Sequence, residues 1–209
     1  MLIKTLTVGM LDTNCYVVTD EKTRLCAIID PGAESNTILD YIESNKLEPA
    51  AIFLTHGHFD HHIALRAVMD ATGAPVYVSM PDVNTGGRRD QHMVDNISGL
   101  VWYSEGSVIK VGNLVFTVLE TPGHSPGSVT LKCESALFTG DTLFCDGCGR
   151  TDLAGGSMDL LLASLRRLAA LEGDYEVYPG HDRSTTLDRE RSFNYYMKHA
   201  TSGSQVVLI

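Results

Sequence analysis

The stretch that is most informative about the fold of this 209-residue chain is Thr55-His56-Gly57-His58-Phe59-Asp60-His61-His62. It follows an apolar run at 50–54, which predicts a buried strand. If 54–58 remains extended, His56 and His58 point to the same face, because side chains alternate along a strand. The chain then turns into a helix near residue 60, so Asp60 and His61 lie beside that pair but are aimed elsewhere. Two candidate ligands on each side suit two adjacent metal ions better than one.

Three further candidate ligands each follow a predicted strand and a Gly or Thr. They are His124 after 114–120, Asp141 after 135–139 and His181 after 176–178. Strand ends on one rim of a sheet converge, and glycine allows the sharp bends needed there, so we expect these side chains to meet those of the first stretch. Imidazoles and carboxylates packed so closely need protons or metal to satisfy them, which predicts a metal site.

The three remaining histidines carry no such signal. We interpret His62 as a helix residue, His92 as part of a polar excursion and His199 as a surface residue of a terminal helix. The polar stretch 81–98 is predicted to be irregular or a short helix. Its Arg88 and Arg89 are interpreted as belonging to an ordinary solvated loop, although they would also suit an anionic substrate.

The rest of the chain mixes strand and helix patterns. Strands are predicted at 2–8, 14–19, 25–30, 50–54, 75–79, 107–111, 114–120, 127–133, 135–139 and 176–178, and helices at 36–46, 63–71, 158–171 and 187–199. The clearest helix is 158–171, with Ser157 as its cap and Gly173 as its stop. Runs of strands followed by a helix, repeated in the second half, favour two sheets packed face to face with helices outside. No linker interrupts residues 1–209, which predicts one domain.

Composition excludes several classes of partner. The formal net charge of −10 argues against nucleic acid and anionic membranes, because both need a basic surface. No run approaches the ~18–20 apolar residues that cross a bilayer, and the N-terminus does not resemble a signal peptide. Five cysteines are an odd set, so we expect no disulfide framework and a cytoplasmic location. Cys145 and Cys148, spaced as CxxC, are interpreted as reduced loop cysteines.

The ligand pattern resembles the metallo-β-lactamase superfamily, whose signature is Thr-His-x-His-x-Asp-His followed by Gly-His, Gly-Asp and Pro-Gly-His. The flanking motifs are similar to its glyoxalase II-like branch, and the resemblance runs from residue 2 to about 195. These motifs are Thr13-Asn14-Cys15-Tyr16, Ile29-Asp30-Pro31-Gly32, Thr121-Pro122-Gly123-His124-Ser125-Pro126-Gly127-Ser128, Gly140-Asp141-Thr142-Leu143-Phe144 and Gly149-Arg150-Thr151-Asp152.

The resemblance implies an α+β fold, a four-layer αββα sandwich with two mixed sheets and metals at one edge. It implies that His56, His58 and His124 hold one ion, that Asp60, His61 and His181 hold a second, and that Asp141 bridges them. Two divalent ions are expected, zinc first, with iron or manganese as alternatives. The chain departs from the family at His62-Ile63-Ala64-Leu65, where small residues are usual, and it ends before the helical domain that helps glyoxalase II enzymes bind glutathione.

The implied function is a small-molecule hydrolase in which a metal-bridging hydroxide attacks a thioester or ester carbonyl, with Asp60 also orienting the nucleophile. The alternative is a persulfide dioxygenase with one iron held by His56, His124 and Asp141. A non-catalytic structural metal fits poorly, because structural zinc sites are usually cysteine-rich. Asp30 and Arg150 match motif positions. We interpret them as residues that orient ligands or organise loops, and a purely structural role is equally open.

Overall fold

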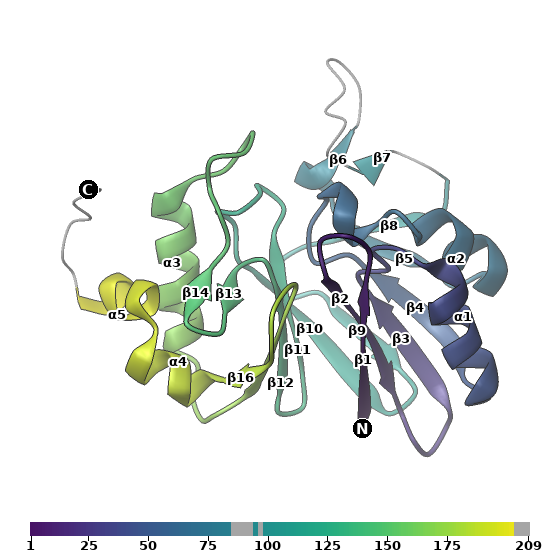
Figure 1. Cartoon of the computed structure of the whole chain (residues 1–209). Helices are drawn as coiled ribbons and strands as arrows, with labels where there is room; N and C mark the ends of the chain where they lie inside the picture. Colours follow the sequence, from purple (N-terminus) through teal and green to yellow (C-terminus); the bar gives the residue numbers. More distant parts are fainter. Residues whose placement is uncertain (85–93, 96–97, 203–209) are drawn as a thin grey trace.

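Two six-stranded sheets pack face to face at the centre of the structure (Figure 1), a computed structural model that describes residues 1–84, 94–95 and 98–202. The first sheet has the order β1-β2-β3-β4-β5-β8. Its strands are β1 (Leu2–Val8), β2 (Thr13–Thr19), β3 (Leu25–Ile29), β4 (Glu48–Phe53), β5 (Val76–Ser79) and β8 (Leu100–Tyr103). β1 to β3 are antiparallel and β3, β4, β5 and β8 are parallel, so this sheet is mixed as predicted.

The second sheet has the order β16-β15-β12-β11-β10-β9. Its strands are β9 (Val108–Val111), β10 (Leu114–Glu120), β11 (Val129–Cys133), β12 (Ala136–Gly140), β15 (Glu176–Pro179) and β16 (Thr185–Thr186). All its pairings are antiparallel except β12 with β15, which are parallel. That one parallel pair puts the ends of β12 and β15 side by side, and the two loops that follow them carry Asp141 and His181.

Side-chain alternation divides the core into layers. In β3, Ala27 and Ile29 face the space between the sheets, whereas Cys26 and Ile28 face outward. The inner layer contains Phe53, Phe116 and Phe138, with the Phe53 and Phe116 ring centroids 5.0 Å apart. The outward-facing apolar side chains also need to be covered from water, and the helices supply that cover.

Helices cover both outer faces (Figure 1). Over the first sheet, α1 (Ser35–Ser44) and α2 (Leu65–Thr72) bury Ile38, Ile42, Leu65 and Val68 against the outward side chains. Over the second sheet, α3 (Met158–Ala169) buries its leucine stripe together with residues of α4 (Leu187–Phe193) and α5 (Tyr195–Ser202). The predicted four-layer αββα sandwich is therefore confirmed. Within the described residues no helix is long and apolar enough to cross a membrane.

Several boundaries differ from the prediction. The single helix expected at 187–199 is wrong, because Asn194 adopts an extended backbone conformation and separates α4 from α5. Asn194 is fully buried, and its amide donates to the carbonyls of Phe144 and Gly147 at 3.3 and 2.9 Å. α3 begins after Ser157, whose hydroxyl caps the backbone N–H of Leu160, but it ends at Ala169 rather than at residue 171.

Some short elements were not predicted. They are β8, β16 and the hairpin of β13 (Leu143–Phe144) with β14 (Gly147–Cys148). The stretch 81–98 is described only at its two ends, where η2 (Met80–Asp82), β6 (Val83–Asn84) and β7 (Val94–Asp95) lie. His92, Arg88 and Arg89 lie outside the described residues, so the structure does not test the roles predicted for them.

Candidate metal centre

Four loops at one edge of the sandwich carry the candidate ligands. β4 ends at Phe53, and residues 55–56 form a bend rather than continuing the strand, so the predicted extended stretch 54–58 is wrong. The single-turn helix η1 (Phe59–His61) then supplies Asp60 and His61. The loops after β10, β12 and β15 supply His124, Asp141 and His181. The candidate ligand side chains that follow these strands thus lie together at one rim.

The first group is His56, His58 and His124, whose ligand nitrogens all lie within 4.8 Å of one another. Nδ1 of His58 is 2.8 Å from Nε2 of His124. The ring of His56 stands nearly perpendicular to both other rings, with centroid distances of 4.8 Å. All three side chains are buried, so this group is a pocket of imidazole nitrogens with little access to water.

The second group is Asp60, His61 and His181, again with ligand atoms within 4.8 Å of one another. Oδ2 of Asp60 lies 3.4 Å from Nε2 of His61 and 3.2 Å from Nε2 of His181. His61 is completely buried, whereas the side chain of His181 is 21% exposed. This group therefore opens toward solvent more than the first.

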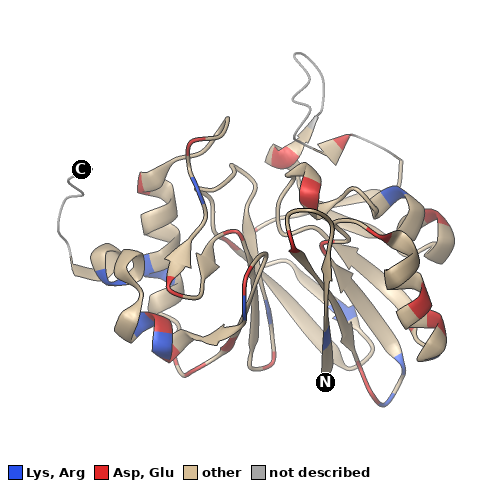
Figure 2. Cartoon of the chain, viewed as in Figure 1, with Lys and Arg blue, Asp and Glu red and all other residues tan. Residues whose placement is uncertain are grey.

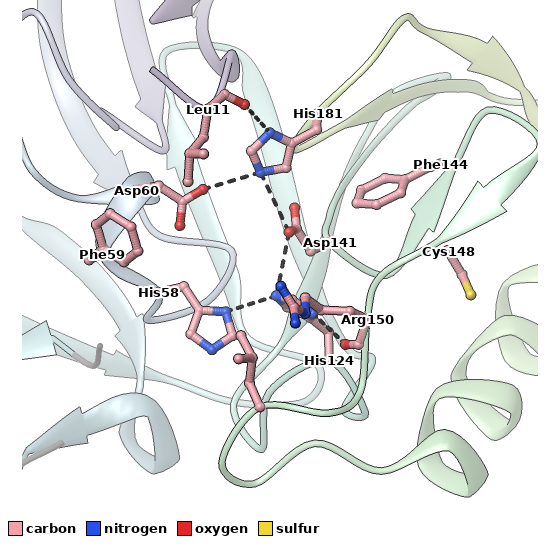
Figure 3. Close-up of a pocket in the computed structure, with 11 residues that line it drawn as sticks. Leu11, His58, Phe59, Asp60, His124, Asp141, Phe144, Cys148, Arg150 and His181 are labelled. Carbon is pink, nitrogen blue, oxygen red and sulfur yellow. Dashed lines mark hydrogen bonds and ion pairs between the residues drawn. The ribbon is translucent and has the colours of Figure 1, made fainter. Parts of the chain in front are cut away.

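Asp141 lies between the two groups (Figure 3). Its Oδ2 is 3.4 Å from Nε2 of His124 and 3.6 Å from Nε2 of His181. Its Oδ1 is 3.5 Å from Nε2 of His61. One carboxylate thus reaches both groups, which is the position that the resemblance assigned to a bridging ligand.

Partners behind the rings fix which nitrogen faces the centre. Nδ1 of His124 donates to the carbonyl of Arg150 at 2.7 Å, and Nδ1 of His181 donates to the carbonyl of Leu11 at 2.9 Å. Nδ1 of His61 lies 3.0 Å from Oδ2 of Asp30. Donation through Nδ1 leaves a neutral ring with its lone pair on Nε2, the form that binds metal.

The charge environment differs between the groups. Burial, together with the neighbouring imidazoles, lowers the pKa of His56 well below its usual value, and burial and His124 lower the pKa of His58 to about 4. Burial opposes protonation of His61 as well, but Asp141 and Asp30 outweigh it and raise its pKa to about 9. Burial also opposes protonation of His181, and the hydrogen bond with Asp60 raises its pKa. Burial thus disfavours protonation of His56 and His58, whereas the neighbouring carboxylates favour protonation of His61 and His181.

The donor set fits divalent metal. Nε2 of His56, Nε2 of His61 and Oδ1 of Asp141 are buried and have no hydrogen-bond partner. Buried polar atoms without partners are costly, and a cation bound by these side chains would satisfy them. Nitrogen and carboxylate ligands without cysteine suit zinc, iron or manganese.

Asp30 and Arg150 have definite places. The carboxylate of Asp30 accepts from the backbone N–H of Thr55 at 2.7 Å and from its hydroxyl at 2.6 Å, as well as contacting His61. It therefore holds both the His56 bend and a ring of the second group. Arg150 contributes its main-chain carbonyl to His124, while its guanidinium pairs with Asp152.

Asp82 is a residue that the sequence analysis missed. It is fully buried, and its Oδ2 accepts from the N–H of Gly57 at 2.8 Å while its Oδ1 accepts from the N–H of Gly127 at 2.6 Å. Oδ2 also accepts from the hydroxyl of Ser125 at 2.6 Å. A Cβ on Gly57 would lie 2.5 Å from the carbonyl oxygen of Asp82, so only glycine fits there. The available signal was an acidic residue just after the predicted strand 75–79.

Two of the histidines that carried no ligand signal in the sequence, His62 and His199, belong to neither ligand group. His62 lies at the end of η1 and not in a helix, because α2 starts at Leu65. His199 is half-buried in α5 and stacks on Tyr195. All five cysteines are free thiols. Cys145 also groups with Asp146 and Glu190, but the guanidinium of Arg189 pairs with both of those carboxylates.

A cavity of about 520 Å³ opens onto the two groups. Its wall contains ligands of both groups and several apolar side chains. The lining residues are Leu11, His58, Phe59, Asp60, His124, Asp141, Phe144, Cys148, Arg150, Leu153 and His181. A volume of this size accommodates a small organic molecule.

The sandwich and its histidine-rich rim together define a class of protein in which two sheets present metal ligands at one edge. The family model of the metallo-beta-lactamase superfamily matches residues 8–181. The chain therefore belongs to the metallo-β-lactamase superfamily, as the sequence motifs predicted.

Named relatives refine that placement. The hydroxyacylglutathione hydrolase GloC of Haemophilus influenzae is 30% identical, with 94% of this chain and 98% of the relative covered. ETHE1 from Myxococcus xanthus has a TM-score of 0.81 and 30% identity, covering 99% of this chain and 92% of its own. TTHA1623, solved in a di-iron-bound form, has a TM-score of 0.80 and 34% identity, covering 92% of this chain and 99% of its own.

Proposed function

We propose that this chain is a metal-dependent hydrolase of small-molecule thioesters or esters, glyoxalase II-like in its chemistry. The observation that carries the proposal is the convergence of seven ligand side chains in two groups that share Asp141. A carboxylate within reach of both groups could serve two ions at once. The names of GloC and of the di-iron form of TTHA1623 support the same conclusion.

The chain's own residues would hold and orient the reacting parts. His56, His58 and His124 would bind one ion, Asp60, His61 and His181 the other, and Asp141 both; zinc is proposed first, with iron or manganese as alternatives. Two such ions, when bound, would lower the pKa of a shared water from ~15.7 to near 7 and stabilise the developing oxyanion.

Asp60 has a second task in this proposal. Its Oδ2 lies 3.2 Å from Nε2 of His181 and accepts from the hydroxyl of Thr13 at 3.3 Å. These contacts fix the carboxylate at the mouth of the second group, where it would orient the attacking water. The leaving thiolate needs little protonation, because thiols have a pKa near ~8.5.

A persulfide dioxygenase is the second candidate. It is favoured by one observation. His56 and His124 of the first group, together with Asp141, supply a two-histidine, one-carboxylate set without any residue of the second group. That set is the pattern of non-haem iron oxygenases. The second group, with all three ligands in place, favours the hydrolase.

The test is metal-dependent thiol release. Protein stripped by chelation and reloaded with zinc, iron or manganese is assayed with S-acyl substrates, and free thiol is measured together with oxygen uptake. The hydrolase predicts thiol release without oxygen uptake and two ions per chain. Oxygen uptake on a persulfide substrate, with one iron per chain and no thioester hydrolysis, would reject it in favour of the dioxygenase.

A further inference from the structure

Large apolar side chains surround the cavity above the candidate centre. Leu11, Phe59 and Leu153 line it and remain 53%, 40% and 37% exposed, and Phe144 lines it as well. Phe59 and Phe144 lie on opposite sides of the histidine cluster (Figure 3). Each of the four comes from a different segment of the chain, so separate loops converge to build one apolar wall. Exposed apolar patches of this kind mark binding sites.

The same wall offers no available cation among its described residues. Arg150 is the one Lys or Arg that lines the cavity, and its Nε and Nη2 each donate to a different oxygen of Asp152 at 2.7 Å. That bidentate pair compensates its charge. Figure 2 shows further basic residues on α3, α4 and α5, and Arg183, on the loop that carries His181, pairs with Asp146. Among the described lining residues, a carboxylate on the substrate would therefore find no unpaired Lys or Arg.

We propose that the substrate carries an apolar acyl group, aliphatic or aryl and of about hexanoyl size, next to the scissile carbonyl. This inference rests on the proposed function and specifies its substrate class. The ligand groups bind the polar carbonyl end, while Leu11, Phe59, Phe144 and Leu153 cover the acyl chain. A cavity of about 520 Å³ has room for both. The small polar lactoyl group of the glyoxalase II substrate would leave this wall exposed to water.

Binding, measured without turnover, is the first test. The probes are the non-hydrolysable thioethers S-methyl- and S-hexyl-N-acetylcysteamine, titrated calorimetrically into the full-length, metal-loaded protein. Each methylene that the wall buries is worth about fourfold in affinity. We expect the hexyl compound to bind at least about tenfold more tightly than the methyl compound. Equal affinities would overturn the inference, whatever the protein hydrolyses.

Turnover is the second test, and it separates this inference from the proposed function. With acetyl-, lactoyl- and hexanoyl-N-acetylcysteamine, we expect kcat/KM to be highest for the hexanoyl thioester. Faster hydrolysis of the lactoyl compound than of the hexanoyl compound overturns the inference and leaves the hydrolase intact. Tight hexyl binding without hydrolysis of any thioester rejects the proposed function and keeps the apolar ligand class.

A variant pair locates the effect. Leu153→Ser removes part of the wall, and Leu160→Ser removes a similarly exposed leucine that does not line the cavity. Leu153→Ser is expected to reduce the hexyl-to-methyl affinity ratio at least about threefold, while Leu160→Ser keeps the wild-type ratio. Because each value is a ratio within one variant, a partial loss of folded protein cancels. Equal affinity ratios in the two variants would show that the apolar wall does not bind the hexyl group, which would overturn the inference.

Discussion

The two ligand groups sit side by side but are built differently. The first, His56, His58 and His124, consists of imidazoles alone and is buried throughout. The second joins two imidazoles to Asp60, and His181 remains partly exposed. Burial keeps the pKa values of His56 and His58 low, whereas carboxylates raise those of His61 and His181. The two groups therefore differ in burial and in the presence of a carboxylate of their own, which only the second has.

Each group has its own buried aspartate behind it. Asp82 ties together the turns that carry His58 and His124, and Asp30 contacts His61 and the bend at Thr55. The two supports come from different sheet loops, and Asp141 is the part of the centre that both groups share. Asp82 therefore supports the first group alone, whereas Asp30 contacts His61 directly and also lies behind His56 through the bend at Thr55.

The largest effect is expected from Asp141→Asn. The amide keeps the size of the side chain but loses one acceptor oxygen and the negative charge that both groups use. Loss of a partner behind a ligand costs ~10–100-fold in metal affinity or activity, so loss of a shared ligand should exceed ~100-fold in thiol release. Steady-state assay at saturating metal measures it.

The matched control is Asp70→Asn, an exposed carboxylate that pairs with Arg66 on α2. Surface pairs of this kind contribute at most ~0.5 kcal/mol, so activity and stability should stay near wild type. Wild-type activity in Asp141→Asn would show that the shared carboxylate is dispensable.

Asp30→Asn should weaken the second group most, because Asp30 contacts His61 directly and reaches His56 only through Thr55. Oδ2 of Asp30 accepts the hydroxyl of Thr55 and contacts Nδ1 of His61 at 3.0 Å, and an amide nitrogen in that position cannot accept. We expect the affinity of the second ion to fall by ~10–100-fold. Titration with Co²⁺, followed by its absorption spectrum, resolves the two binding steps.

Asp82→Asn should produce the opposite selectivity. Asparagine keeps only one acceptor oxygen, so the backbone N–H of either Gly57 or Gly127 loses its partner. The turn that carries that glycine is then held less firmly. The expected loss is again ~10–100-fold, now in the affinity of the first ion. If Asp82→Asn and Asp30→Asn weakened the same step, the two supports would not be separate.

The smallest effect is expected from Arg150→Ala. Although Arg150 belongs to a motif, His124 contacts its main-chain carbonyl, which alanine keeps. The guanidinium pairs with exposed Asp152 and touches no ligand. Metal affinity should change by less than about threefold, since exposed ion pairs contribute little. A loss above tenfold would assign the side chain a direct role.

The ligands were predictable because each one is a polar residue placed at a strand end. Strand ends such as those before Asp141 and His181 must share a rim, whatever the details of the loops. The stretch 54–58 is not extended throughout, so the condition for strand alternation is not met, yet the His56 and His58 ring centroids lie 4.8 Å apart. Convergence thus depended on the rim and not on strand alternation.

The supporting contacts were not predictable, because they depend on distant partners. Asp82 has meaning only when Gly57 and Gly127 lie beside it. No glycine or proline marks the helix break at Asn194 in the sequence. The break comes from the buried side-chain amide of Asn194, which donates hydrogen bonds to the β13–β14 hairpin. Strands of two residues, such as those of this hairpin, are too short for any periodicity to show.

Metal content per chain tests the central claim most directly. We would measure it by mass spectrometry of extensively dialysed wild type, His58→Ala and His181→Ala, each loaded identically and checked for folding by circular dichroism. Two cooperating groups give two ions in the wild type and about one in each variant. A single ion in the wild type, retained in His181→Ala and lost in His58→Ala, would contradict the account.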